Sequence, residues 1–242
     1  MAAAEPTATD RVYDALYAAV LEHRLLPGMR LREEELAERF AVSRTVVRQA
    51  LQRLAQNRLV ELQHNRGAQV AEPTRELAAH VFDARRVVEC EVARRLGGRL
   101  PAGARDELSS LLAEESAAQA RGDRPAAIRL SGQFHRRLAE LSGNPVFLNV
   151  LDELLPTTSL LMALDSGTTR ALCVDHRHQE LLTALVDSGP AAAAEMRRHL
   201  REIEQALARP RRDAFAAYRE TGIPQVSGAV AGKPLRGRKA TP

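Results

Sequence analysis

The sequence predicts a mainly α-helical protein in two parts: an N-terminal domain with a helix-turn-helix and a small β-hairpin, and a C-terminal bundle of six antiparallel helices. The apolar spacing in residues 36–60 indicates two short amphipathic helices separated by a turn. Residues 58–71 alternate between apolar and polar side chains around a second turn, as the strands of a hairpin do. From residue 75 to about residue 208 the apolar residues keep a helical period. The 242 residues are enough for two hydrophobic cores.

The N-terminal domain is expected to span residues 10–73, after a disordered terminus of residues 1–9. Its first helix is predicted over residues 11–25 and ends at the Pro27-Gly28 turn. Ser43 has a side chain that caps helix N-termini, so it marks the start of the helix that follows the turn of the helix-turn-helix.

Burial of the apolar face of this second helix leaves Arg44, Thr45, Arg48 and Gln52 on its outer side. Arginine can contact guanine O6 and N7 with two hydrogen bonds, and threonine can reach a phosphate or a thymine methyl group. Residues 39–66 contain six arginines and one acidic residue, a local balance of 6 − 1 = +5, which favours a polyanionic partner. A solvated three-helix bundle with a basic surface is the alternative, and we favour DNA binding over it.

The predicted hairpin has strands at residues 58–63 and 68–71 and a turn that begins with His64, Asn65 and Arg66. A hairpin directly after a DNA-reading helix is a wing, whose tip lies over the phosphate backbone or enters the minor groove. The N-terminal domain is therefore predicted to be a winged helix-turn-helix.

These motifs resemble the winged-helix domain of the GntR family of bacterial transcription regulators. The similarity covers about residues 12–73 and includes the PG turn, the LAERF helix, the VSRT turn and the closing NRGAQVA wing. The resemblance implies DNA contacts from these residues: Arg44, Thr45, Arg48, His64, Asn65, Arg66 and Gly67. The chain departs from the family at Val46, where proline is usual, and at Gln49, where glutamate is usual. Neither departure removes a contact residue.

The C-terminal domain is expected to span residues 74–210 and to be followed by a largely disordered tail, residues 211–242, that is rich in Gly, Ala and Pro. Glycine and proline breakers divide the domain into six predicted helices, at residues 75–97, 103–121, 124–142, 145–165, 169–187 and 190–208. An antiparallel bundle of this kind places ligand sites between facing helices.

The two cysteines, Cys90 and Cys173, lie far apart and lack the spacing of a metal site, so we interpret them as buried thiols of a reducing cytoplasm. No secretory signal is visible in residues 1–10. The apolar run at residues 154–164 is too short to span a membrane, so we expect a cytoplasmic protein without a membrane partner.

Three histidines lie on the predicted inward faces of three different helices of the bundle. They are His135, His178 and His199, whereas His176 is rotated away from its apolar stripe. Converging imidazoles are suited to a divalent transition metal. The alternative is that each is an ordinary core histidine. A metal-dependent hydrolase fused to a DNA-binding module is a third hypothesis. The sequence argues against it, because it shows no second carboxylate suited to be a general base near the histidines and no nucleophile motif.

The segments FDARRVVE, FHRRLAELSGNP, HQELLTALV and AEMRRHL resemble the all-helical FCD effector domain of the FadR-like branch of the GntR family, over about residues 77–208. The resemblance implies a divalent metal, Zn or Ni, held by one Asp and three His, which correspond to Ser131, His135, His178 and His199, with His176 as the fallback. Ser131 replaces the carboxylate with a hydroxyl. The metal would then be held more weakly, be completed by water or effector, or be absent.

The same resemblance implies a small organic-acid effector in the bundle. Arg85 would pair with its carboxylate; the alternative is a bridge from Arg85 to Glu89, and Arg86 is a second candidate for the effector. The expected protein is a homodimeric repressor that reads a pseudo-palindromic operator and responds to this effector. A metal-free, effector-binding regulator is the alternative that the Ser131 departure leaves open.

Overall fold

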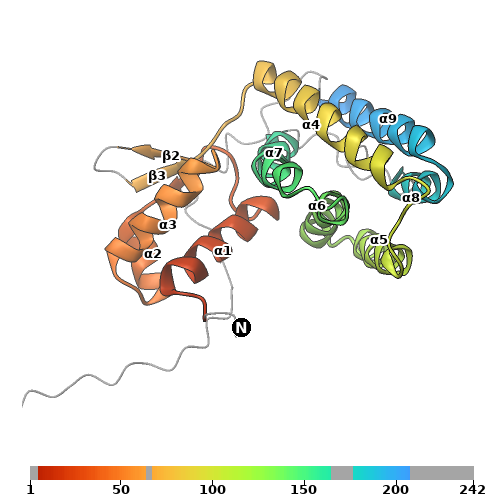
Figure 1. The fold of residues 1–242 in the computed structure, drawn as a ribbon. Coiled ribbons are helices and arrows are strands. Elements are labelled where there is room, and N and C mark those ends of the chain that lie inside the picture. Colours follow the sequence, from red (N-terminus) through yellow and green to blue (C-terminus); the bar gives the residue numbers. More distant parts are fainter. Residues whose placement is uncertain (1–4, 64–66, 165–176, 208–242) are drawn as a thin grey trace, which may run out of the picture.

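The computed structural model describes residues 5–63, 67–164 and 177–207 (Figure 1). The described chain forms an N-terminal domain of helices and a small sheet, followed by an all-helical domain. The described helices and the small sheet confirm the predicted fold class. The predicted tail, Cys173, His176 and the wing tip at residues 64–66 lie outside the described residues.

The N-terminal domain contains α1 (Ala8–Leu21), β1 (Arg30–Leu31), α2 (Glu33–Phe40), α3 (Arg44–Gln56), β2 (Val60–Gln63) and β3 (Gly67–Val70). Its three strands are antiparallel in the order β1-β3-β2, with Val60 opposite Val70 and Arg30 opposite Gln69. The strand β1 was not predicted, because two residues are too short to show an alternating pattern. It extends the predicted hairpin into a sheet.

Capping residues set the helix starts in this domain. The Ser43 hydroxyl accepts a hydrogen bond from the Val46 N–H at 3.3 Å, so α3 begins where the sequence predicts. Thr7 and Asp10 form a capping box, in which each side chain accepts from the other's backbone N–H. Helix α1 therefore starts at Ala8, three residues earlier than predicted, and the last residues of the terminus expected to be disordered are helical.

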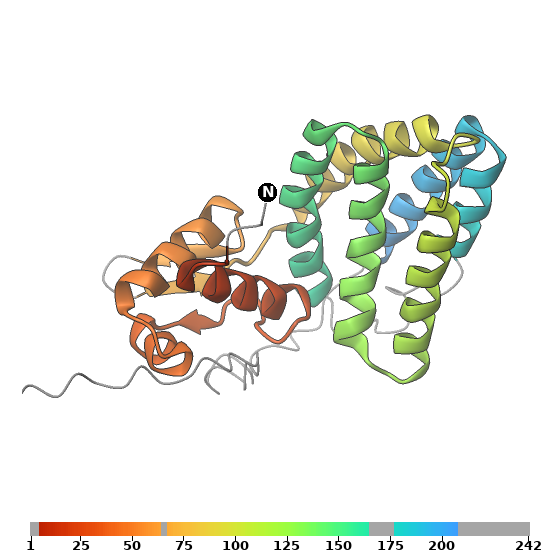
Figure 2. The ribbon, with the colours of Figure 1, turned by 60° about the horizontal axis from the view of Figure 1, so that its bottom comes forward.

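The C-terminal domain contains α4 (Arg75–Leu96), α5 (Ala104–Ala120), α6 (Arg124–Leu141), α7 (Pro145–Leu164), α8 (Arg177–Asp187) and α9 (Gly189–Leu207). These are the six predicted helices; the predicted start of the fifth, at residue 169, lies outside the described residues. Figure 2 shows α5, α6 and α7 side by side, and α4 and α9 pack along each other. Gly189 permits the close approach of α9 to α4, because a Cβ there would lie 2.4 Å from the Arg94 carbonyl oxygen.

Helix α7 belongs to both domains. Leu160 is fully buried in the hydrophobic core of the N-terminal domain, whereas its neighbour Leu161 is buried in the core of the bundle. The helix is long and apolar enough to cross a membrane by length and composition, with 44% of its most apolar window buried. Part of that apolar character is explained by burial, since Leu160 and Leu161 each pack in a protein core. Figure 1 shows α7 as the bundle helix next to α1.

Candidate functional site

Three histidines from three helices of the bundle meet at one point. The Nε2 atom of His135 on α6 lies 3.2 Å from the Nε2 of His178 on α8 and 3.2 Å from the Nε2 of His199 on α9. All three side chains are buried. One nitrogen from each lies within 4.8 Å of the others, which is close enough for a single ion to touch all three.

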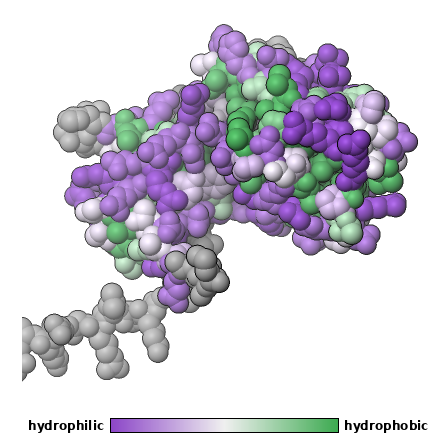
Figure 3. Space-filling view, in the orientation of Figure 1, coloured by the Kyte–Doolittle hydropathy of each residue, from purple (hydrophilic) through white to green (hydrophobic). Residues whose placement is uncertain are grey.

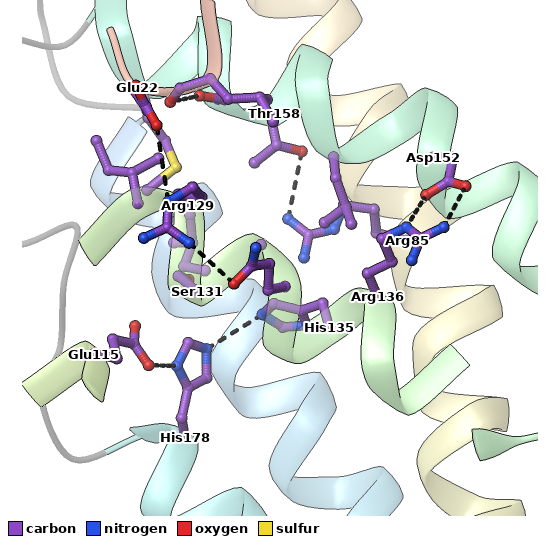
Figure 4. A pocket seen from close by; sticks show the side chains of 18 of the residues that line it. Glu22, Arg85, Glu115, Arg129, Ser131, His135, Arg136, Asp152, Thr158 and His178 are labelled. Carbon is purple, nitrogen blue, oxygen red and sulfur yellow. Dashed lines mark hydrogen bonds and ion pairs between the residues drawn. The ribbon is translucent and has the colours of Figure 1, made fainter. Parts of the chain in front are cut away.

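Two buried carboxylates orient these rings from behind. The Nδ1 of His178 donates to Glu115 Oε2 at 2.8 Å, as Figure 4 shows, and the Nδ1 of His135 lies 2.5 Å from Glu89 Oε2. A ring that carries its proton on Nδ1 presents the lone pair of Nε2 to the centre of the cluster. Helices α4 and α5 therefore supply the outer contacts of the histidine cluster.

Two glutamates that the sequence analysis did not place near the histidines, Glu89 and Glu115, lie beside them. Glu115 continues the buried face of Leu108 and Leu112 on α5, and Glu89 lies one turn after the buried Arg85 on α4. This spacing places both carboxylates inside the bundle, and it was visible in the sequence. Both groups contact histidines, so neither is placed as a free general base.

Burial favours the neutral, metal-binding form of the His135 and His199 imidazoles. Desolvation lowers the pKa of His199 well below its usual value, and the neighbouring histidines lower it further. Desolvation also lowers the pKa of His135, although Glu89 opposes this. Neutral imidazoles whose Nε2 lone pairs face each other at 3.2 Å repel unless a cation or a proton lies between them. The donor set fits a divalent transition metal.

Ser131, which the resemblance aligns with a carboxylate ligand, lines the cavity beside this cluster one turn before His135. Its hydroxyl is a weaker donor than a carboxylate. The side of the three-histidine cluster next to Ser131 is therefore open to the cavity.

Arg85 is fully buried beside the cluster and forms the bridge to Glu89 that the sequence suggested as one alternative. Its Nε donates to Glu89 Oε1 at 2.5 Å, and its Nη1 donates to Thr158 Oγ1 of α7 at 3.3 Å. Burial raises the pKa of Glu89, but Arg85 and His135 together hold it well below its usual range. Arg85 also lines the cavity, so the bridge and a ligand contact are compatible.

Arg86, the second predicted effector-binding residue, does not reach the cavity within the described part of the chain. Its guanidinium pairs with Glu204 on α9 and with Asp83 on α4. Successive residues of a helix point in directions about 100° apart, and here Arg85 faces the cavity while Arg86 faces α9. The described cavity therefore supports Arg85, and not Arg86, as a ligand contact.

A cavity of about 400 Å³ opens from the histidine cluster towards the N-terminal domain (Figure 4). Its polar end is formed by the three histidines with Arg85 and Ser131. Apolar side chains from α6, α7 and α9 also line the cavity, namely Ile128, Leu155, Met162 and Ile203. The last wall comes from α1, with Tyr17, Ala18, Leu21 and Glu22. This wall could not be predicted, because periodicity shows which face of a helix is buried and not which element covers it.

Those predicted DNA-facing residues that the structure describes lie on one surface. Arg44, Thr45, Arg48 and Gln52 are exposed on α3, and Gly67 starts β3 close to the β1 backbone. Arg44, Arg48, Gln52 and Gly67 line one hollow with residues of β1 and α2. Figure 3 shows that the surface over α2 and α3 is mostly hydrophilic.

The arginines of this surface are paired with acidic residues of α2. Arg48 makes two bonds to Glu33, Nε to Oε1 at 2.9 Å and Nη2 to Oε2 at 2.7 Å. The Nη1 of Arg44 donates to Glu34 Oε1 at 2.8 Å. These acids precede residues 39–66, so the charge count of +5 over that segment overstates the positive charge of the folded surface. Glu33 fixes the guanidinium of Arg48 in one orientation.

Two family matches cover most of the described chain. Residues 8–70 match the bacterial regulatory proteins of the gntR family, and residues 80–202 match the FCD domain. The chain belongs to the GntR family. It is a DNA-binding transcription regulator with an FCD domain, as the resemblance predicted.

Relatives of this GntR-family chain agree in length and fold. The HTH-type transcriptional repressor RspR of Escherichia coli K12 is 25% identical over 206 residues, covering 84% of this chain and 90% of RspR. The crystal structure of a transcriptional regulator GntR from Rhodococcus sp. RHA1 superposes with a TM-score of 0.75 at 27% identity and covers 84% of this chain and 99% of that one. E. coli McbR/YncC shares the fold, with a TM-score of 0.70 at 23% identity over 82% of this chain and 94% of its own.

Proposed function

We propose that this GntR-family regulator is a repressor whose affinity for its operator is set by a small carboxylate in the cavity, bound next to a divalent metal. The observation that carries the proposal is the convergence of three buried Nε2 atoms, two of them 3.2 Å from the third, at the polar end of the cavity. The names of RspR and of NanR from Salmonella, which is 29% identical over 163 residues, support repression as the outcome.

His135, His178 and His199 would hold the ion, with Zn or Ni as the expected metals. Bound there, a divalent metal supplies a Lewis-acidic position for one oxygen of the ligand. Glu89 and Glu115 hold the rings with their Nε2 atoms facing inward, and Arg85 places a guanidinium beside the same position. A carboxylate entering the cavity would meet this guanidinium and the open side of the cluster left by Ser131.

A metal-free version of the same regulator remains the second candidate, and Ser131 favours it. A neutral hydroxyl at the place of the family's carboxylate leaves three neutral ligands without a negative charge among them. In that case Arg85 and the other residues at the polar end of the cavity would bind the carboxylate without a metal. A hydrolase receives no such support, because Glu89 and Glu115 are both engaged by histidines.

On DNA, α3 would lie in the major groove with Arg44, Thr45 and Arg48 at base edges and Gln52 beside them. The wing residues His64, Asn65, Arg66 and Gly67 would contact the backbone or the minor groove. Two protomers of a homodimer would read the two halves of a pseudo-palindromic operator, as the symmetry of such sites requires. The protein would act in the cytoplasm.

The cavity connects ligand binding to the DNA-binding domain because α1 forms one of its walls. A second connection runs through α7, where the Ser159 hydroxyl donates to the Leu21 carbonyl oxygen at 2.9 Å and His23 Nε2 donates to the Ser159 carbonyl oxygen at 2.8 Å. A ligand that fits one placement of α1 better than another shifts the population of DNA-binding arrangements, by no more than its difference in affinity.

Metal content tests the proposal. Protein purified without a histidine tag or chelator should contain about one divalent transition metal per chain, and His178→Ala should lose it. His80→Ala is the matched control, because His80 is exposed on the outer side of α4 and should keep the metal. If the wild-type protein is purified without metal and binds none after incubation with Zn or Ni, the proposed metal site is wrong. The metal-free regulator, in which Arg85 binds the carboxylate, would then be the supported hypothesis.

A further inference from the structure

The cavity has a second charged end, formed between the two domains. Arg129 of α6 lies with its Nε 3.7 Å from Oε1 of Glu22, which ends α1 in the DNA-binding domain (Figure 4). Both residues line the cavity, on the side of the α1 wall. The side chain of Arg129 is 40% exposed and that of Glu22 is 19% exposed, so ligands and solvent can reach the pair.

The contact between Glu22 and Arg129 is loose, and each residue has another partner. Arg24 binds Oε2 of Glu22 through its Nε at 2.8 Å and through its Nη2 at 2.6 Å. The Nη1 of Arg129 donates to the Gln133 side chain at 3.3 Å. Glu22 would therefore stay paired after it leaves Arg129, and Arg129 would keep a fixed orientation.

We propose that Glu22 occupies the position of a ligand's second anionic group, and that the cavity takes a dicarboxylate or similar two-ended anion. One end of the ligand would lie at Arg85 and the histidine cluster. The apolar side chains of α6, α7 and α9 that line the same cavity suit an aliphatic chain. The far carboxylate would replace Glu22 on Arg129, since a free anion with a full guanidinium face can make tighter bonds than the 3.7 Å contact.

This inference rests on the proposed function and adds to it the class of ligand and a route to the DNA. Glu22 belongs to the DNA-binding domain and Arg129 to the bundle, so exchanging the partner of Arg129 removes one attraction between the two domains. Binding of a two-ended anion is then linked to release of α1, and a one-ended anion leaves that contact in place.

The test uses the full-length protein loaded with Co²⁺, whose visible bands report the metal, and calorimetry for carboxylate binding. The ligands are two matched series of straight-chain acids, malonate to pimelate and the monocarboxylates of equal carbon number. The variants are Arg129→Gln and Glu22→Gln, with Arg121→Gln and Glu114→Gln as matched controls, because Arg121 and Glu114 are exposed away from this contact.

In the wild type one length of dicarboxylate should bind roughly tenfold tighter than its monocarboxylate partner, the effect of one charge-assisted contact. Arg129→Gln should abolish that preference. Glu22→Gln should strengthen dicarboxylate binding several-fold, because the competing carboxylate is gone, and leave monocarboxylates unchanged.

Equal binding of the two series in the wild type, or a Glu22→Gln variant that matches the wild type, overturns the inference alone. Cobalt bands that survive in His178→Ala overturn the metal site, while the dicarboxylate preference read by calorimetry still decides the role of Glu22. If no acid of either series binds, the carboxylate ligand of the proposed function is wrong and this inference falls with it.

Discussion

Leu160 of α7 should stabilise the DNA-binding domain although it belongs to the bundle in sequence. Its side chain is fully buried in the N-terminal core, whereas Leu161, the next residue, is buried in the bundle core. Truncation of a fully buried leucine to alanine costs about 3 to 5 kcal/mol, because apolar contact is lost and a cavity is left. Leu160→Ala should impose that cost on the N-terminal domain, and Leu161→Ala on the bundle.

Hydrogen exchange followed by mass spectrometry distinguishes the two variants. A loss of about 3 kcal/mol corresponds to roughly a hundredfold faster exchange for amides that open only with their domain. In Leu160→Ala the acceleration should appear in peptides of α3 and β2, and in Leu161→Ala it should appear in peptides of α4 and α9. If Leu160→Ala accelerates only the bundle peptides, α7 does not join the two cores and the account of domain coupling is wrong.

Three further predictions concern DNA contacts and pH. Arg48→Ala should weaken operator binding by about 1 to 3 kcal/mol, measured by fluorescence anisotropy, if Arg48 contacts a base. The control variant Arg121→Ala should bind the operator as the wild type does. An unchanged operator affinity in Arg48→Ala would show that Arg48 does not contact a base. Glu33→Gln frees the Arg48 guanidinium and removes a negative charge from the DNA-facing surface. It should therefore raise the affinity for unrelated DNA more than the affinity for the operator. An equal rise in both affinities would refute the role of Glu33 in positioning Arg48. Burial and Arg124 lower the pKa of His23 to about 4, against the donated bond to Ser159. The unfolded imidazole takes up a proton near pH 6.5 and the folded one only near pH 4, so stability should fall between those values, by at most about 3 kcal/mol. The free energy of unfolding in urea should differ less between pH 7.5 and pH 5 in His23→Gln than in the wild type. An equal difference in the two proteins would show that His23 does not cause the pH dependence.

Local patterns predicted the parts of this protein that depend on neighbouring residues. Ser43 as a cap, the inward faces of His135, His178 and His199, and the bridge from Arg85 to Glu89 all follow from spacing within one helix. Such features depend on the helical period of 3.6 residues, which the sequence shows directly.

Contacts between distant segments escaped prediction. Nothing in the apolar pattern of α7 distinguishes Leu160, which packs in the N-terminal core, from Leu161, which packs in the bundle. Glu115 was overlooked because a glutamate on an apolar face has no visible partner until α8 brings His178 to it. The α1 wall of the cavity likewise arises from docking of two domains, which no spacing rule describes.

The response of operator binding to a carboxylate ligand shows whether the histidine site controls DNA binding. Operator fragments are first selected from random DNA with the full-length protein, and their affinity is then measured by anisotropy with metal-loaded protein, with and without the tightest-binding carboxylate. The ligand should weaken operator binding of the wild type, whereas His178→Ala should bind the same DNA equally well and not respond to the ligand. A response of equal size in His178→Ala, or none in the wild type, would contradict control of DNA binding through the histidine site.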